Sequence, residues 1–313
     1  MAPPRIVVIV NPKAQNGALG ARWADIGASI RRELGSFDDV RTASPGDATR
    51  LAREAIDGGA DVVVAIGGDG TINEVTNGFF DGDEPIGNGA SLAVIPFGTG
   101  GDFRKTLHIP KDVARAARII AEGKTRVIDV GHVELVDHSG APASRVFANI
   151  ASFGMSGLVV KYANESSKRF GGRITFMLAT ARASFKYDNQ RVRMVFDGDP
   201  ESAVETTIST VAVSNGRFFG GGMKIAPEAE LDDGKFDVVA LGDLGLTDFI
   251  LNSRRIYAGT HLSLEKVSCR RARTVTAEAL GSEIIQMDVD GEQPGRLPAT
   301  FRVLPRALSL VVP

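Results

Sequence analysis

The stretch that most constrains the fold is residues 62–79, VVVAIGGDGTINEVTNGF. It begins with the apolar and largely β-branched run Val62–Ile66, which is typical of a strand buried on both faces. Glycine and aspartate fill positions 67–70, and an amphipathic segment that predicts a helix begins at Thr71. A buried strand, a glycine turn and a helix in this order predict one unit of an α/β fold.

A glycine turn at a helix start is suited to binding phosphate. Glycines let a ligand approach the backbone, and the first helical turn offers unpaired N–H groups and a positive dipole. Asp69 stands within the turn, where a carboxylate repels phosphate unless a cation such as Mg²⁺ lies between them. The turn therefore indicates metal-assisted phosphate chemistry, with a purely geometric strand–helix connection as the alternative.

Two common phosphate motifs do not fit the chain. Walker A requires a glycine five residues before Gly-Lys-Thr, and the segment Gly123–Thr125 has Arg118 at that position. The dinucleotide fingerprint requires a third glycine, and Asn73 stands there. A phosphate site at this turn would therefore belong to another class.

The order of predicted elements divides the chain into two domains. Residues 1–126 alternate strands and helices, which predicts a parallel sheet with helices on both faces. The apolar C-terminal segment 306–313 is predicted to return as a strand of this domain. A length of 313 residues also favours two domains.

The second part, residues 127–305, contains mostly strands, several of them alternating in polarity. This pattern favours an antiparallel β-sandwich, and predicted helices at 172–186 and 247–258 would be insertions in it. The predicted strands span residues 126–136, 145–153, 191–196, 205–214, 236–241, 264–277, 284–289 and 300–304.

Composition limits the class of protein. A net charge of −2 gives no overall attraction to nucleic acid, so we expect no nucleic-acid partner. The single cysteine, Cys269, excludes a disulfide framework and a cysteine zinc cluster. No stretch approaches the roughly 18 apolar residues of a membrane-spanning helix, and no signal peptide precedes the first strand. We therefore expect a cytoplasmic protein, with a peripheral contact at the inner membrane face.

Several segments occur together in the order of one known family. They are Asn11–Gly17, Gly67–Glu74, Pro96–Phe103, Ile128–Gly131, Ala226–Gly234 and Asp290–Glu292. On these segments the chain resembles the soluble bacterial lipid kinases of the diacylglycerol kinase and sphingosine kinase catalytic-domain family, in the superfamily of NAD kinase and phosphofructokinase. The resemblance implies an ATP-binding α/β domain followed by a lipid-substrate β-sandwich, with Mg²⁺ as the cofactor.

The resemblance also implies a nucleotide site in the first domain. The residues it assigns to nucleotide binding are Asn11, Pro12, Lys13, Gly17, Thr42, Gly67, Gly68, Gly70, Thr71, Asn73, Glu74, Gly98, Thr99 and Asp102. Asp69 would be the magnesium partner and part of the catalytic set. The family usually has Asn directly before Asp102, and this chain has Gly101 there.

The resemblance also implies a catalytic role for one segment of the second domain and a metal-binding role for another. Glu292 would be the general base, with Asp290 as the second choice, although Asp-Gly alone is a strong hairpin-turn signal. In the Leu-Asp-Asp-Gly segment, Asp233 would donate its carboxylate to a structural metal, and Glu230 and Lys235 would donate main-chain carbonyls. A simple turn is the alternative there too.

The sequence thus predicts a kinase that transfers the γ-phosphoryl group of ATP to a hydroxyl of a diacylglycerol or sphingoid-like lipid. A soluble NAD-kinase-like enzyme and a catalytically silent lipid-binding protein are the alternatives. The segment 174–178 is predicted to line an acyl-chain groove. An arginine cluster (Arg254, Arg255, Arg270, Arg271 and Arg273) is interpreted as a solvated face, with membrane docking as the alternative. A homodimer is left open.

Overall fold

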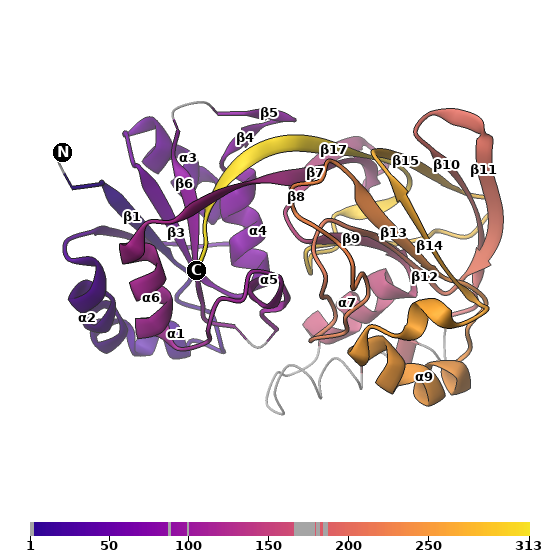
Figure 1. The fold of residues 1–313 in the computed structure, drawn as a ribbon, viewed down its shortest axis with the longest axis horizontal. Helices are drawn as coiled ribbons and strands as arrows, with labels where there is room; N and C mark the ends of the chain where they lie inside the picture. Colours follow the sequence, from indigo (N-terminus) through magenta and orange to yellow (C-terminus); the bar gives the residue numbers. More distant parts are fainter. Residues whose placement is uncertain (1–2, 87–88, 99, 166–178, 180–181, 184–186) are drawn as a thin grey trace. The chain divides into compact units, whose positions relative to one another are not determined.

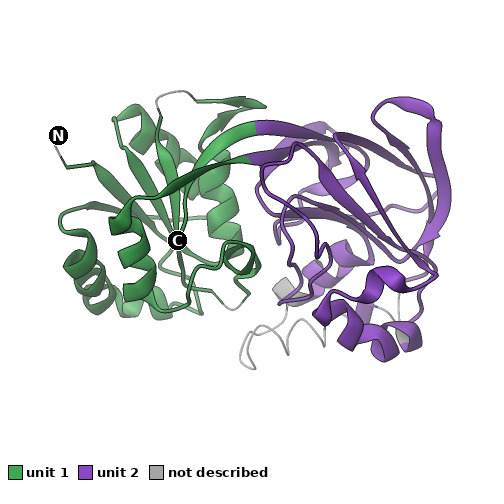
Figure 2. Ribbon diagram, viewed as in Figure 1, with its two compact units in different colours: residues 1–128, 306–313 green, residues 129–305 purple. Residues whose placement is uncertain are grey.

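The computed structural model of the chain describes residues 3–86, 89–98, 100–165, 179, 182–183 and 187–313. The chain divides into two compact units, residues 1–128 with 306–313 and residues 129–305 (Figure 2). Strands β7 (Thr125–Asp137) and β17 (Gly295–Val311) each contribute residues to both units (Figure 1).

The first unit is built on a parallel sheet. Its strands follow the order β2 (Asp38–Arg41), β1 (Ile6–Val10), β3 (Val62–Gly67), β6 (Ser91–Pro96) and the end of β17. Strand β17 joins β6 in parallel, with Leu310 opposite Leu92. The apolar strands β1, β3 and β6 are almost completely buried, as expected for parallel strands covered on both faces.

Helices cover the two faces of this sheet. Helix α2 (Trp23–Leu34) packs beside α6 (Val113–Glu122), and α3 (Asp47–Asp57) packs beside α4 (Asp69–Asn77). The smaller elements are α1 (Ala18–Ala21), β4 (Phe80–Asp81), β5 (Glu84–Pro85) and α5 (Asp102–Thr106). The predicted parallel sheet with helices on both faces is confirmed.

The second unit contains two antiparallel sheets. One follows the order β11 (Asp199–Ile208), β10 (Gln190–Phe196), β15 (Thr274–Ala279), β17, β7 and β8 (Pro142–Phe147). The other follows the order β14 (Val267–Ala272), β13 (Phe236–Leu241), β12 (Thr210–Ser214), β9 (Ile150–Gly154) and β16 (Met287–Val289). The helical elements described here are α7 (Met155–Glu165), α9 (Leu246–Ala258) and the short η2 (His261–Ser263).

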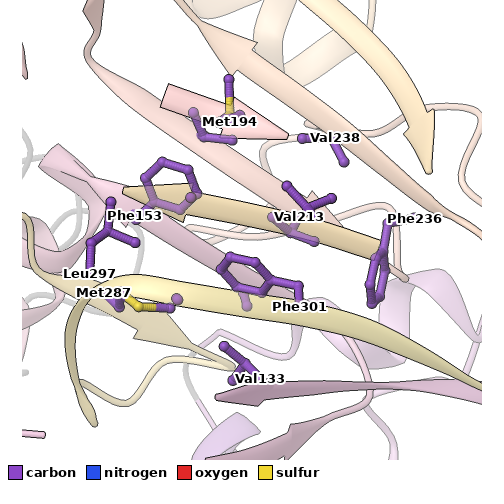
Figure 3. Close-up of a cluster of buried hydrophobic side chains, with 14 of the residues drawn as sticks. Val133, Phe153, Met194, Val213, Phe236, Val238, Met287, Leu297 and Phe301 are labelled. Atoms are coloured by element: carbon purple, nitrogen blue, oxygen red, sulfur yellow. The ribbon is translucent and has the colours of Figure 1, made fainter. Parts of the chain in front are cut away.

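A hydrophobic core joins the two sheets of this unit (Figure 3). The rings of Phe147 and Phe236 stack with centroids 5.6 Å apart, and those of Phe153 and Phe301 with centroids 6.1 Å apart. Each pair takes one ring from each sheet, and all four side chains are fully buried. Two antiparallel sheets packed face to face are a β-sandwich, which confirms the predicted fold of the second part.

Three predicted strands each prove to be two strands in different sheets. The changes of sheet fall between Phe147 and Ile150 in the stretch 145–153, between Ile208 and Thr210 in the stretch 205–214, and between Ala272 and Thr274 in the stretch 264–277. A run of strand-forming residues does not reveal such a change, because both halves bury a face in the same core. Most of the predicted helix 172–186, including the segment 174–178, lies outside the described residues.

Candidate functional site

Loops follow the carboxyl ends of neighbouring parallel strands in the first unit. Backbone hydrogen bonds tie these loops to the adjacent strands. Asn11 N donates to Ile66 O at 3.2 Å, and Phe97 N donates to Gly67 O at 2.7 Å. Ligands of open α/β sheets bind at this edge. The predicted nucleotide loops after β1, β3 and β6 therefore share the appropriate edge of the sheet.

Asn11 connects the first of these loops to helix α4. Its Nδ2 donates to Thr71 Oγ1 at 2.9 Å, and its Oδ1 accepts a hydrogen bond from Lys13 N at 3.0 Å. Thr42 follows β2, and its amide donates to Val10 O at 3.0 Å. These contacts place the predicted residues Asn11, Lys13, Thr42 and Thr71 around the end of β1.

Gly68 and Gly98 allow the second and third loops to touch. A Cβ added to Gly98 would lie 2.6 Å from Gly68 Cα, so a side chain there would force the loops apart. Gly68 is the N-cap residue of α4 and offers no side-chain acceptor to the first N–H groups of the helix. This helix start therefore has the character of an anion site.

Asp69 is held in place by the third loop. Its Oδ2 accepts a hydrogen bond from Gly101 N at 2.8 Å, and its Oδ1 accepts one from Asp102 N at 3.1 Å. Gly101 has φ 67°, in the left-handed region that Gly and Asn adopt most readily. Glycine in place of the family's Asn therefore keeps the backbone conformation and loses only the side chain. One carboxylate beside substrate phosphates is a common magnesium donor set, so Asp69 is chemically suited to that role.

Other predicted nucleotide residues make structural contacts. Glu74 Oε2 accepts a hydrogen bond from Ala48 N at 3.1 Å, which satisfies an amide at the start of α3. Pro12 O accepts one from Gly20 N at 3.1 Å, and Gly17, with φ 86°, is the N-cap residue of α1. Their roles toward a nucleotide remain predictions, as do those of Gly70 and Asn73 in α4. Thr99 lies outside the described residues.

In the second unit, the Asp-Gly-Glu segment forms the turn between β16 and β17. Val289 N donates to Glu292 O at 2.8 Å, and Glu292 N donates to Val289 O at 3.0 Å. Asp290 and Gly291 have φ 49° and 90°, as a type I′ hairpin turn requires. Glu292 is exposed at the end of this turn. The backbone is therefore the hairpin turn that Asp-Gly predicts, and it carries an accessible carboxylate.

Asp290 anchors the same turn to strand β9. Its carboxylate accepts hydrogen bonds from Ala148 N at 3.0 Å, Ile150 N at 2.8 Å and Asn149 N at 3.3 Å. Its own amide donates to Ile150 O at 3.0 Å. Only 9% of the residue is exposed, so Glu292 is the more accessible of the two predicted carboxylates.

Asp288 holds the turn from the other side, and the sequence did not single it out. Its Oδ1 accepts a hydrogen bond from Gly291 N at 2.8 Å, and Ser152 Oγ donates to its Oδ2 at 3.3 Å. Burial raises the pKa of Asp288 to about 8. Nothing in the strand pattern signals this role, because it depends on the position of β9 beside β16.

Asp288 should make the stability of the protein dependent on pH. Its folded pKa lies above the roughly 3.9 of an unfolded Asp, so the folded state binds the proton more tightly. Its stabilising contribution is complete in acid and is lost as the pH rises toward 8. Asp288→Asn stays neutral and should therefore lose less Tm between pH 6 and pH 8.5 than the wild type. Thermal melts at both pH values test this, and equal losses would contradict it.

The Leu-Asp-Asp-Gly loop is paired with a positively charged side chain, Arg271 of strand β14. Asp233 Oδ2 pairs with the Arg271 guanidinium, and Asp233 Oδ1 accepts a hydrogen bond from Lys235 N at 3.0 Å. Arg271 Nε also lies 3.8 Å from Oδ2 of Asp237, whose pKa is raised by burial. No cluster of three or more His, Cys, Asp or Glu side chains able to hold a metal occurs in the described part of the chain. A metal ion at Asp233 would therefore compete with Arg271.

Asp129 and Asn215 connect this loop to the β9 region, and neither was predicted as a site residue. Asp129 Oδ2 accepts a hydrogen bond from Gly234 N at 2.6 Å. Asn215 Nδ2 donates to Asp129 O at 2.9 Å and to Ala148 O at 2.8 Å. Both residues are fully buried. Asp129 lies in the segment Ile128–Gly131 that carries part of the resemblance, but neither that segment nor a carboxylate inside an apolar strand identifies the partner.

The chain joins an α/β unit, whose glycine loops are suited to phosphate, to a β-sandwich unit, and the family matches follow this division. Residues 5–133 match the diacylglycerol kinase catalytic domain, and residues 149–312 match the YegS C-terminal NAD kinase beta sandwich-like domain. The chain is 33% identical to a diacylglycerol kinase of Bacillus subtilis over 99% of this chain and 96% of that protein. It is 30% identical to a diacylglycerol kinase of Mycobacterium tuberculosis over 99% and 95% of the two chains.

A solved structure of a candidate diacylglycerol kinase from Bacillus anthracis has the same fold. It is 26% identical, covers 100% of this chain and 98% of its own, and has a TM-score of 0.77. The chain belongs to the diacylglycerol kinase catalytic-domain family, which confirms the resemblance seen in its loops. It is a lipid kinase, an ATP-dependent phosphotransferase that acts on an alcohol group. Among the described helices, none has the length and apolar character needed to cross a membrane.

Proposed function

We propose that the lipid phosphorylated by this kinase is a diacylglycerol. The proposal is supported by the end-to-end similarity to the Bacillus subtilis enzyme of that name. A panel of diacylglycerol, sphingosine, ceramide and NAD, each offered with ATP in mixed micelles, tests it. A clear preference for another acceptor would contradict the proposal. Lipid binding without turnover of any acceptor would favour a silent lipid-binding protein.

In this proposal the loops of the first unit hold ATP. The amides of Gly68–Thr71 at the start of α4 bind phosphate, and Lys13 adds a positive charge from the first loop. Asp69 is the residue that would hold Mg²⁺, and the bound ion would offset the negative charge that develops on the phosphates. Phosphoryl transfer depends mainly on such positioning and charge neutralisation.

In the second unit, Glu292 acts as the general base for the acceptor hydroxyl. A carboxylate removes the proton as the oxygen attacks phosphorus, and an exposed position lets a lipid head group reach it. Asp290 and Asp288 position the turn that carries Glu292, because their carboxyl groups accept hydrogen bonds from backbone amides of β9 and of the turn itself. This assigns Asp290 to positioning more than to proton transfer.

The proposed structural metal at Asp233 predicts a distinctive response to magnesium. Asp233→Ala should lower Tm and abolish any Mg²⁺-dependent rise in Tm, because a ligand that binds only the folded state stabilises it by mass action. Arg271→Met removes the competing guanidinium and should enlarge that rise. Melting curves across a magnesium titration, without nucleotide, provide the measurement. A Tm independent of Mg²⁺ in all three proteins would show that the loop is only a turn.

The proposed substrate also places the reaction at a membrane. Diacylglycerol resides within the bilayer, so the kinase must contact the lipid surface to reach it. We propose a peripheral contact of this kind, and its location is argued below. A homodimer is compatible with the same proposal, and light scattering at several protein concentrations tests it.

A further inference from the structure

Helix α9 presents an unusual solvent-facing surface. Its exposed residues are Thr247, Ile250, Leu251, Arg254, Arg255 and Ala258. They recur at intervals of three and four residues, so they share one face of the helix. We call these six residues the α9 face.

The α9 face is apolar at one end and basic at the other. Ile250 and Leu251 are 60% and 79% exposed, and Leu251 is the most exposed large apolar residue in the described part of the chain. One helical turn later come Arg254 and Arg255, both exposed. Within the described residues neither guanidinium forms an ion pair with a carboxylate.

The rest of α9 is firmly held by the second unit, at whose surface the helix lies (Figure 1). On the inner side, Ile256 is 1% exposed. At the start of the helix, Asp248 accepts a hydrogen bond from Gly245 N at 3.3 Å and pairs with Lys266 at 3.1 Å. The exposed apolar pair therefore lies within the body of the helix and not at its end.

A pocket lies beside the same end of the helix. It has a volume of about 450 Å³, and its lining includes Met155, Leu241, Leu244 and Phe249. The same wall contains Asp188, Asn189 and Asp243, so the pocket is polar and apolar in equal measure. The apolar part of the α9 face is therefore Ile250 and Leu251 alone.

We infer that the α9 face docks the enzyme on an anionic lipid surface. A helix that pairs exposed Ile and Leu with neighbouring arginines matches the interfacial helices that bury apolar side chains among acyl chains and direct cations to head groups. Each arginine near such a surface adds binding that weakens with salt. The overall charge of −2 leaves a local patch as the source of this attraction. The inference rests on the proposed function only in that the substrate is a bilayer lipid.

Vesicle binding tests the inference without requiring catalysis. The full chain is sedimented with phosphatidylcholine vesicles that contain, or lack, about 30% phosphatidylglycerol, an anionic lipid. The wild type should bind the anionic vesicles more tightly than the neutral ones. Ile250→Gln/Leu251→Gln should lose about 10-fold or more of its partitioning, because two apolar side chains no longer enter the membrane. Arg254→Gln/Arg255→Gln should lose mainly the part that depends on anionic lipid and salt.

A matched control and a spectroscopic reporter make the test specific. Val204→Gln changes a residue that is 40% exposed on β11 and should leave vesicle binding unchanged. The only tryptophan, Trp23, is buried, so Leu251→Trp adds a reporter whose emission should shift to the blue on vesicles. The emission of the Val204→Trp protein should not shift on vesicles.

Several outcomes would overturn the inference. The first is wild-type binding that does not depend on anionic lipid, and the second is unchanged binding of the Ile250→Gln/Leu251→Gln protein. A third is a change in oligomeric state of that variant without a loss of vesicle binding, which would assign the α9 face to a second copy of the chain. Glu292→Gln should bind vesicles like the wild type. Loss of turnover in that protein therefore bears on the proposed function and not on docking.

Discussion

Glu292→Gln should lower kcat for the best lipid acceptor by about 100-fold or more, the usual scale of a general base. Glutamine keeps the size of the side chain and its hydrogen bonding but removes its basicity. Glu292 lies exposed at the turn, so its replacement should leave Tm nearly unchanged. ATP affinity should also stay close to that of the wild type. Calorimetry for ATP and a mixed-micelle assay for turnover measure the two quantities on the same preparation.

Asp290→Asn is the matched comparison, and it should behave differently. Its carboxylate accepts backbone amides through both oxygens, so the amide group of asparagine would direct an N–H group at another N–H group. This variant should therefore lose Tm together with turnover. Normal turnover of Glu292→Gln with a folded but inactive Asp290→Asn would make Asp290 the base. Full activity of both variants would show that the Asp-Gly-Glu segment is only a hairpin turn, without a catalytic role.

Asp69→Asn should lower kcat by at least about 100-fold and raise the Mg²⁺ concentration needed for half-maximal activity. The carboxylate carries the charge that would hold Mg²⁺, and asparagine removes that charge. Both oxygens also accept loop amides, so a fall in Tm should accompany the loss. Turnover measured across a magnesium titration separates weaker metal binding from a slower chemical step.

Asp112→Asn is a suitable control for this variant. Asp112 caps α6 and accepts a hydrogen bond from Arg115 N at 2.8 Å, and asparagine caps helices as well as aspartate does. Turnover and magnesium dependence should therefore match the wild type. Near-normal activity of purified Asp69→Asn would reject the proposed magnesium role.

The variants proposed above should differ in which measured property they change. Asp288 and Asp290 have buried carboxyl groups that orient a turn, and Glu292 has an exposed carboxyl group at its end. Variants of the first two should change stability, whereas the Glu292 variant should change turnover alone. The α9 variants should change neither property on acceptors dissolved without vesicles. The three groups of residues can thus be separated by Tm, turnover and vesicle binding.

Local sequence patterns were sufficient to predict the class of each unit and the loops of the first. Val62–Ile66 reads as a buried strand because its side chains are apolar on both faces, and Gly67–Gly70 reads as a turn because of its glycines. These are local properties, set by the periodicity and the backbone freedom of adjacent residues. The order of such segments was enough to predict a parallel sheet followed by a sandwich.

Contacts between residues far apart in the sequence could not be predicted from these local patterns. The stretch 264–277 reads as one strand but serves two sheets, because both halves bury one face in the same core. Asp290 reads as a turn residue, and its anchoring to Ile150 depends on a strand 140 positions away. The pairing of Asp233 with Arg271 and the exposure of Leu251 are likewise set by long-range packing. Burial and pairing across such distances depend on the whole fold, and no local pattern encodes them.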